Sequence, residues 1–120
     1  MRIALIWPSE QSVLETVPLA YGLLHPPLTA AGHEVKILNC SLEGWGPADP
    51  ELLRQISEFQ PDVVGATGWP TTVASAFASV RAIRVVAPDA VYVMGGNYAT
   101  LNPEVTWETG LFDYIIRYEG

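Results

Sequence analysis

Short apolar runs rich in β-branched residues recur roughly every 28 residues, and they constrain the fold more than any other feature of the sequence. Runs such as IALIW and DVVGAT are hydrophobic almost throughout, without the alternation of a sheet that has one face in water. This pattern predicts a parallel sheet that is covered on both faces. The five expected strands are Arg2–Trp7, Glu34–Asn39, Asp62–Thr67, Ala90–Gly95 and Asp113–Arg117.

Helical patterns separate these runs. Residues 49–51, Asp-Pro-Glu, supply an N-cap, a proline at the first helical position and an early acid. A longer helix is expected to begin near Thr71 or Thr72, and a short one at residues 102–104. Strands that alternate with helices form right-handed βαβ units with helices on both faces. We therefore predict an α/β domain of the Rossmann-like, flavodoxin-like class, with three layers and a five-stranded parallel sheet in the order 2-1-3-4-5.

The first helix fits this scheme least well. Residues 18–31 suit a helix that ends before the turn Gly32-His33, but Pro26 and Pro27 fall inside it. Each proline removes a backbone donor and clashes with the preceding turn, at a cost of about 3 kcal/mol. We therefore expect a kink or two shorter helical pieces.

The composition fits one globular domain at residues 1–120, because 49% of the side chains are hydrophobic and 16% are charged. No stretch approaches the roughly 20 apolar residues of a membrane helix, so we expect no membrane span and, by default, a cytoplasmic protein. The net charge of −7 and the scattered basic residues argue against nucleic acid or an anionic membrane as a partner. The single cysteine, Cys40, has no second thiol with which to form a disulfide or a metal site.

In an open parallel sheet, ligands bind beyond the carboxyl ends of the strands, near the point where the strand order reverses. Gly95 and Gly96 end the fourth strand and let the backbone approach a ligand closely, although a tight turn would also explain them. The 67–72 loop, Thr-Gly-Trp-Pro-Thr-Thr, offers hydroxyl donors and a flat indole, although a capped helix start would also explain it. The first loop, residues 8–17, lies at the same edge and is longer than such connections usually are.

Several catalytic motifs are absent from the sequence. It has no GxxxxGK[ST] phosphate loop, no GxGxxG after the first strand and no HExxH zinc motif. The two histidines, His25 and His33, lie in and just after the first helix, away from the strand ends where a catalytic set would be expected. We expect a ligand-binding chain that has no metal-ligating side chains and is not a complete catalyst by itself.

Four segments, in sequence order, resemble the amino-terminal cobalamin-binding domain of cobalamin-dependent radical S-adenosylmethionine enzymes. The chain opens with MRIALIWP, and residues 17–20 and 31–35, VPLA and AGHEV, resemble that family's first helix and second strand. The run PDVVGATG resembles its third strand, and GGNYAT, PE and DYIIRYEG follow its carboxyl-terminal pattern. The resemblance covers essentially the whole chain.

This resemblance implies a corrinoid ring over the strand ends, with its nucleotide tail between the third-strand and fourth-strand loops. Trp69 would lie near the lower face of the ring. In cobalamin-binding domains whose histidine ligates cobalt, the first loop carries a DxHxxG motif. The first loop of this chain has no such motif, so the resemblance implies that no histidine ligates cobalt. The residues implied to bind the cofactor are Pro8, Ser9, Glu10, Thr67, Gly68, Trp69, Thr71, Thr72, Gly95, Gly96, Asn97, Tyr98, Ala99 and Glu119.

The CxxxCxxC motif that would bind an iron–sulfur cluster is missing, so radical chemistry would need another domain. The resemblance therefore implies one module of a larger enzyme, typically a methyltransferase. The iron–sulfur cluster and S-adenosylmethionine would belong to that enzyme, whose catalytic domain would be the partner in cis or in trans.

Asn97 and Tyr98 stand where the family has proline and histidine. Because of these differences from the family pattern, two other interpretations remain open. One is an interaction module that kept the fold without its ligand. The other is a small nucleotide-binding or flavin-binding protein of the same fold.

Overall fold

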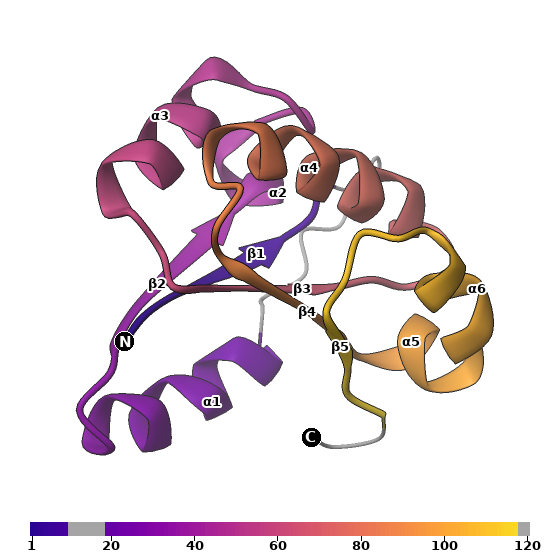
Figure 1. Ribbon diagram of the computed structural model, residues 1–120, viewed down its shortest axis with the longest axis horizontal. Coiled ribbons are helices and arrows are strands. Elements are labelled where there is room, and N and C mark those ends of the chain that lie inside the picture. Colours follow the sequence, from indigo (N-terminus) through magenta and orange to yellow (C-terminus); the bar gives the residue numbers. More distant parts are fainter. Residues whose placement is uncertain (10–18, 118–120) are drawn as a thin grey trace.

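The computed structural model describes residues 1–9 and 19–117, which form a parallel sheet flanked by helices (Figure 1). None of the helices in these ranges is both long and apolar enough to cross a membrane. The strands are β1 (Arg2–Trp7), β2 (Glu34–Asn39), β3 (Val63–Thr67), β4 (Val91–Gly95) and β5 (Tyr114–Ile115). The helices are α1 (Leu19–Ala30), α2 (Cys40–Glu43), α3 (Pro50–Phe59), α4 (Val73–Val86), α5 (Asn97–Leu101) and α6 (Pro103–Glu108).

The sheet has the predicted order, β2-β1-β3-β4-β5, and every neighbouring pair is parallel. Strands β1 and β2 have the expected bounds, and β3 and β4 begin one residue later than expected. The expected fifth strand was too long, because only Tyr114 and Ile115 pair with β4. Their partners are Val93 and Met94, after which β4 runs into the Gly95-Gly96 bend, so the ladder ends there.

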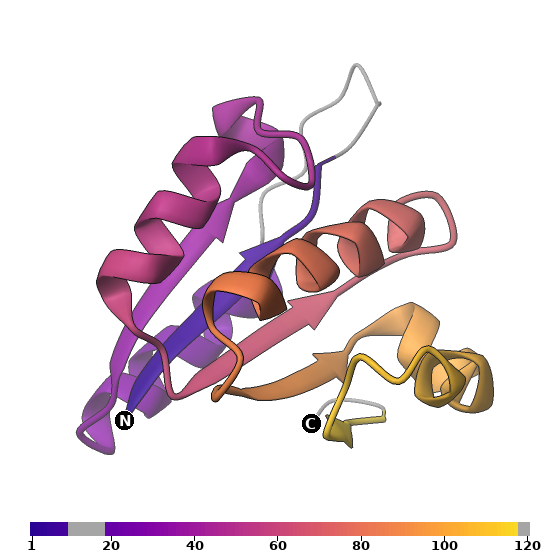
Figure 2. The same cartoon turned by 45° about the horizontal axis from the view of Figure 1, so that its top comes forward.

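The two faces of the sheet carry different helices (Figure 2). Helices α3 and α4 lie together on one face, and α1 lies on the other. Because side chains alternate along a strand, Val64 and Ala66 of β3 point toward α3 and α4, and Ile3 and Leu5 of β1 point toward α1. The main core lies under α3 and α4, and a smaller cluster lies under α1.

The expected helix starts are confirmed for α3 and α4. The Asp49 carboxylate accepts a hydrogen bond from the backbone N–H of Glu51 at 2.9 Å, which satisfies one of the free donors at the start of α3. Helix α4 begins directly after Thr72. Capping chemistry and apolar periodicity thus agree at α3, whereas the Thr72 side chain makes no capping hydrogen bond to α4.

The expected division of the first helix into two pieces is wrong, because α1 runs uninterrupted through Pro26 and Pro27. The missing proline donors leave the carbonyls of Gly22 and Leu23 without their helical partners. Both of these residues are exposed, so water can take the place of the missing donors. The surface position of α1 thus removes most of the reason for the helix to divide.

Two short helices, α2 and α5, form in segments for which the sequence analysis predicted no helix. The side chain of Asn39 caps α2 by accepting from the Leu42 N–H at 3.0 Å, and Gly44 ends the helix in a left-handed conformation. Helix α5 follows Gly96, and the Thr100 hydroxyl donates to the carbonyl of Gly96 at 2.9 Å. Both helices follow the carboxyl ends of strands, so they help to shape the edge where a ligand is expected.

Candidate ligand site at the carboxyl ends of the strands

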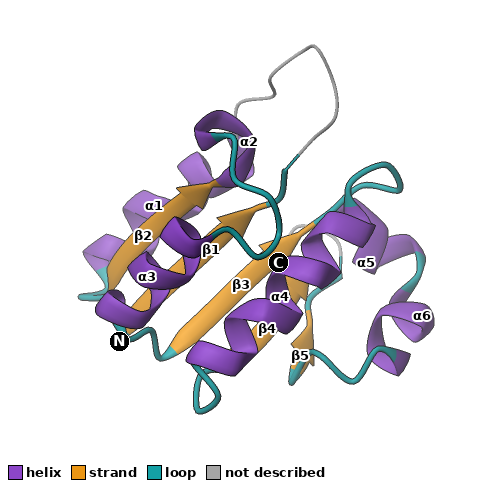
Figure 3. Ribbon diagram, turned by 90° about the horizontal axis from the view of Figure 1, so that it is seen from above, coloured by secondary structure: helices purple, strands orange, loops and turns teal. Residues whose placement is uncertain are grey.

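The last residues of four strands form a row across the carboxyl edge of the sheet. Figure 3 shows the parallel strands running toward this edge. Trp7 of β1 is in register with Asn39 of β2, and Thr67 of β3 is in register with Gly95 of β4. Ile6 pairs with the residue before Thr67, so Trp7 and Thr67 are neighbours. The row crosses the junction between β1 and β3, where the chain reverses the direction in which strands are added.

The structure brings the 67–72 loop and the Gly95-Gly96 bend into direct contact. The backbone N–H of Tyr98 donates to the carbonyl of Gly68 at 3.1 Å. Gly96 has a φ of +91°, and a Cβ at this position would overlap the Thr67 hydroxyl oxygen. Only glycine can therefore hold this bend against Thr67 without displacing it.

The 67–72 loop is ordered by its own hydrogen bonds. The Thr72 hydroxyl accepts from the backbone N–H of Trp69 at 2.9 Å, and Thr72 is 4% exposed. Thr71 is exposed, and the Trp69 side chain is 46% exposed. Thr72 thus shapes the loop, whereas Trp69 and Thr71 present side chains that a ligand could touch.

The other predicted site residues differ in accessibility. Pro8 is buried, and the Ser9 hydroxyl lies 2.5 Å from the hydroxyl of Ser75 in α4. Asn97 is exposed, and the Tyr98 ring packs edge-on against Phe77 with 6.1 Å between ring centroids. Ala99 is fully buried in the main core, so it packs α5 against the core and does not face a ligand. Glu10 and Glu119 lie outside the described residues.

The sequence analysis missed Trp7, which ends β1 in the same row as Thr67. Its side chain is 5% exposed, and its indole Nε1 is buried with no hydrogen-bond partner. The ring packs edge-on against Tyr21 of α1, with 5.6 Å between centroids. Its place at the end of a strand predicted from the sequence was the signal that could have included it with the site.

The ionisable side chains that the structure describes near this edge do not form a metal site. Burial raises the pKa of the Cys40 thiol, at the end of β2, to about 12, so the thiol stays protonated at neutral pH. His33 lies at the opposite edge, with its Nδ1 3.2 Å from the amino terminus, and His25 lies within α1. Nowhere in residues 1–9 and 19–117 do three or more His, Cys, Asp or Glu side chains gather as a metal site would require.

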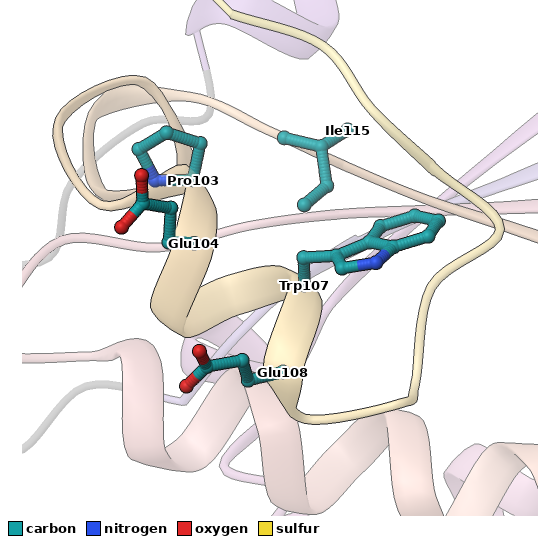
Figure 4. Close-up of a pocket in the computed structure, with 5 residues that line it drawn as sticks. All are labelled: Pro103, Glu104, Trp107, Glu108 and Ile115. Atoms are coloured by element: carbon teal, nitrogen blue, oxygen red, sulfur yellow. The ribbon is translucent and has the colours of Figure 1, made fainter.

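A separate groove of about 370 Å³ lies between α6 and β5 (Figure 4). Trp107 and Ile115 line it together with Pro103, Glu104 and Glu108 of α6. A more polar hollow lies at the amino ends of the strands, where Arg2 and Asp62 meet through a backbone-to-carboxylate hydrogen bond of 2.7 Å. Neither concavity includes the row of strand ends.

Comparison with known proteins decides the family. The model of the B12 binding domain matches residues 11–120. The chain belongs to this family. It is 30% identical over its whole length to an uncharacterized methyltransferase of Pyrococcus horikoshii, and 27% identical over 88% of its length to the cytidylyl-2-hydroxyethylphosphonate methyltransferase of Streptomyces wedmorensis.

A solved structure shows the same fold. The radical S-adenosylmethionine methyltransferase TsrM of Kitasatospora setae, with cobalamin and a 4Fe-4S cluster bound, superimposes with a TM-score of 0.74 and 21% identity. The match covers 90% of this chain and 22% of that protein. The chain likewise spans 27% and 23% of the length of the two methyltransferases above. This B12-binding domain therefore matches only one part of each of these methyltransferases.

Proposed function

We propose that this B12-binding domain, residues 1–120, holds cobalamin without histidine ligation as a module of a radical S-adenosylmethionine enzyme. The observation that carries the proposal is the contact between the 67–72 loop and the Gly95-Gly96 bend beside the strand-order reversal. The 67–72 loop and the Gly95-Gly96 bend together form a narrow backbone cradle, and it lies at the edge where ligands of this fold class bind.

The residues of the cradle suit a large, flat cofactor with a long polar tail. A Cβ at Gly95 would meet nothing closer than the Ile116 carbonyl at 3.8 Å, so there is room beside the backbone for the tail. The exposed Trp69 indole offers a flat apolar surface to the lower face of the ring. The Thr71 hydroxyl and the side chain of Asn97, both exposed, can donate to amide or phosphate oxygens.

The positions of the histidines support binding without a histidine ligand. His33 lies beside the amino terminus of the chain, at the edge opposite the cradle. His25 contacts Thr29 within α1. Cys40 is protonated at neutral pH and does not compete for cobalt, because burial raises its pKa.

The parent enzyme would use this domain to position its cofactor. Bound cobalamin supplies a cobalt centre that can carry a methyl group. The residues of this chain would hold the corrin ring flat over Trp69 and keep water from its lower face. The iron–sulfur cluster, S-adenosylmethionine and the methyl acceptor would bind in a catalytic domain joined in cis or in trans.

The test is reconstitution with excess hydroxocobalamin followed by desalting and a visible spectrum. We expect the wild-type chain to retain about one equivalent of cobalamin. Gly96→Ala should lose at least about tenfold in affinity, because its Cβ displaces Thr67. Gly110→Ala is the matched control, since Gly110 also has a positive φ, +69°, but opens onto free space between α6 and β5.

Two further outcomes discriminate among the alternatives. His25→Ala and His33→Ala should leave both the affinity and the spectrum unchanged, and a changed spectrum would contradict binding without histidine. A colourless wild-type sample would count against cobalamin and favour an interaction module. Quenching of flavin fluorescence by such a sample would favour a flavin-binding protein instead.

A further inference from the structure

The indole N–H of Trp7 is a buried donor that the described structure leaves without an acceptor. Trp7 is 5% exposed, and its Nε1 is fully shielded from solvent. Buried polar groups are paired in the great majority of cases, so an unpaired one needs an explanation. An acceptor supplied by a ligand is one such explanation.

The neighbours of Trp7 do not provide that acceptor. The Tyr21 ring contacts the indole edge-on, and the Tyr21 hydroxyl donates to the carbonyl of Ile6 at 2.8 Å. These contacts hold Trp7 in place without using its donor. The indole is thus fixed by packing, while its buried N–H stays unpaired.

The place of Trp7 in the sheet connects its donor to the proposed site. Trp7 is the last residue of β1 and is adjacent to Thr67, which lies against Gly96. Trp7 and Thr67 belong to the face of the sheet that α1 covers, at the β1–β3 reversal. A ligand bound in the cradle on this face would lie next to Trp7 on the side of β1.

We propose that the Trp7 indole N–H donates a hydrogen bond to an oxygen of the corrinoid, and that Trp7 is a binding residue of this domain. The inference rests on the proposed function. Indole nitrogen is a donor only, so the partner must be an acceptor. A corrinoid offers two kinds of acceptor, the amide carbonyls around the ring and the oxygens of the nucleotide tail.

The experiment compares Trp7→Phe with wild type by titration with hydroxocobalamin and with cobinamide, which lacks the nucleotide. Phenylalanine keeps a ring against Tyr21 but has no donor. We expect Trp7→Phe to bind cobalamin about tenfold more weakly, as the loss of one buried hydrogen bond predicts. A loss confined to cobalamin assigns the acceptor to the tail, and an equal loss for cobinamide assigns it to a ring amide.

Trp45→Phe is the matched control. Trp45 is partly buried against the core on the opposite face of the sheet, and this variant should bind like wild type. Equal affinities of Trp7→Phe and wild type for both corrinoids would overturn the inference. Failure of the wild-type chain to bind either corrinoid would instead overturn the proposed function.

A second measurement needs no stable variant. In a nitrogen-15 spectrum of the wild-type chain, the Trp7 indole N–H should shift downfield and exchange more slowly with solvent when cobalamin is added. The indole signals of Trp45 and Trp107 should move little, because both lie outside the row of strand ends. A Trp7 signal that does not respond to bound cobalamin would contradict the hydrogen bond.

Discussion

The two faces of the sheet differ in how completely the described residues cover them. Under α3 and α4, residues such as Val64, Tyr92 and Ile83 have no exposed surface. On the face of α1, burial is confined to the end near β1, and toward β4 and β5 the sheet becomes exposed, with Val91 37% and Tyr114 64% accessible. One face therefore supplies most of the packing, and the other keeps accessible surface beside the cradle.

This difference connects stability with function. Apolar burial is the dominant favourable term in folding, so the covered face should contribute most of the free energy of unfolding. A ligand needs surface that the protein has not already filled, and the half-covered face offers it next to Gly95. The proposed position of the corrinoid tail thus follows from the side of the sheet that the fold leaves open.

A matched pair of valines tests this division most strongly. Val64 faces α3 and α4 with 0% exposure, and Val91 lies on the opposite face with 37% exposure. Val64→Ala should lower the free energy of unfolding by about 2 kcal/mol, from lost burial and a residual cavity. Val91→Ala should cost about 0.5 kcal/mol, since much of its surface is already in water. Urea unfolding curves measure both, and equal losses would mean that the two faces contribute alike.

The sequence predicted the covered face better than the cradle. The apolar run IALIW predicted β1 to the residue, because a strand buried on both faces is apolar almost throughout. The helical turn at Asn97 and the burial of Ala99 could not be predicted, because both depend on α5 packing against the core. The free donor of Trp7 also depends on tertiary contacts, since an acceptor for an indole can come from anywhere in the fold.

The continuity of α1 illustrates the same limit. Local rules give the cost of Pro26 and Pro27 in an isolated helix, but not whether water can reach the carbonyls that they leave free. That accessibility is set by where the helix lies on the sheet. Sequence patterns therefore identified α1 as a helix, whereas the exposure of its carbonyls to water determined that the two prolines do not divide it.

A pair of tyrosines tests the comparison between the two faces with smaller expected changes in unfolding free energy. Tyr21 donates to the Ile6 carbonyl on the α1 face, and Tyr92 donates to the Ala87 carbonyl at 2.6 Å on the covered face. Each Tyr→Phe variant should cost about 1 kcal/mol of unfolding free energy at pH 7. Cobalamin affinity should fall only in Tyr21→Phe, because Tyr21 holds Trp7 in place. An equal loss of affinity in Tyr92→Phe would contradict the functional division between the faces.

The same tyrosines give the fold an alkaline limit. Burial raises the pKa of Tyr92 to about 12 and raises the pKa of Tyr21 further above the ordinary value of about 10. In this range the folded chain holds protons that the unfolded chain releases, so stability is fully present below pH 10 and is lost as the pH rises toward 12. Thermal melts of wild type and of each phenylalanine variant between pH 9 and 12 measure this, and the variants should show a shallower decline.

The smallest expected effect concerns the outer surface of α3, where Arg54 bridges Glu51 and Glu58. Hydrogen bonds from Arg54 lower the pKa of the Glu51 carboxyl to about 2, so any stabilisation is present above the ordinary pKa near 4 and is lost as the pH falls toward 2. All three side chains are in water, which screens such pairs strongly. At pH 7, Glu51→Gln should therefore shift the urea midpoint far less than Val64→Ala. In 1 M salt the midpoints of Glu51→Gln and wild type should coincide. A Glu51→Gln shift as large as that of Val64→Ala would mean that surface charges, and not the apolar core beneath α3 and α4, stabilise the covered face.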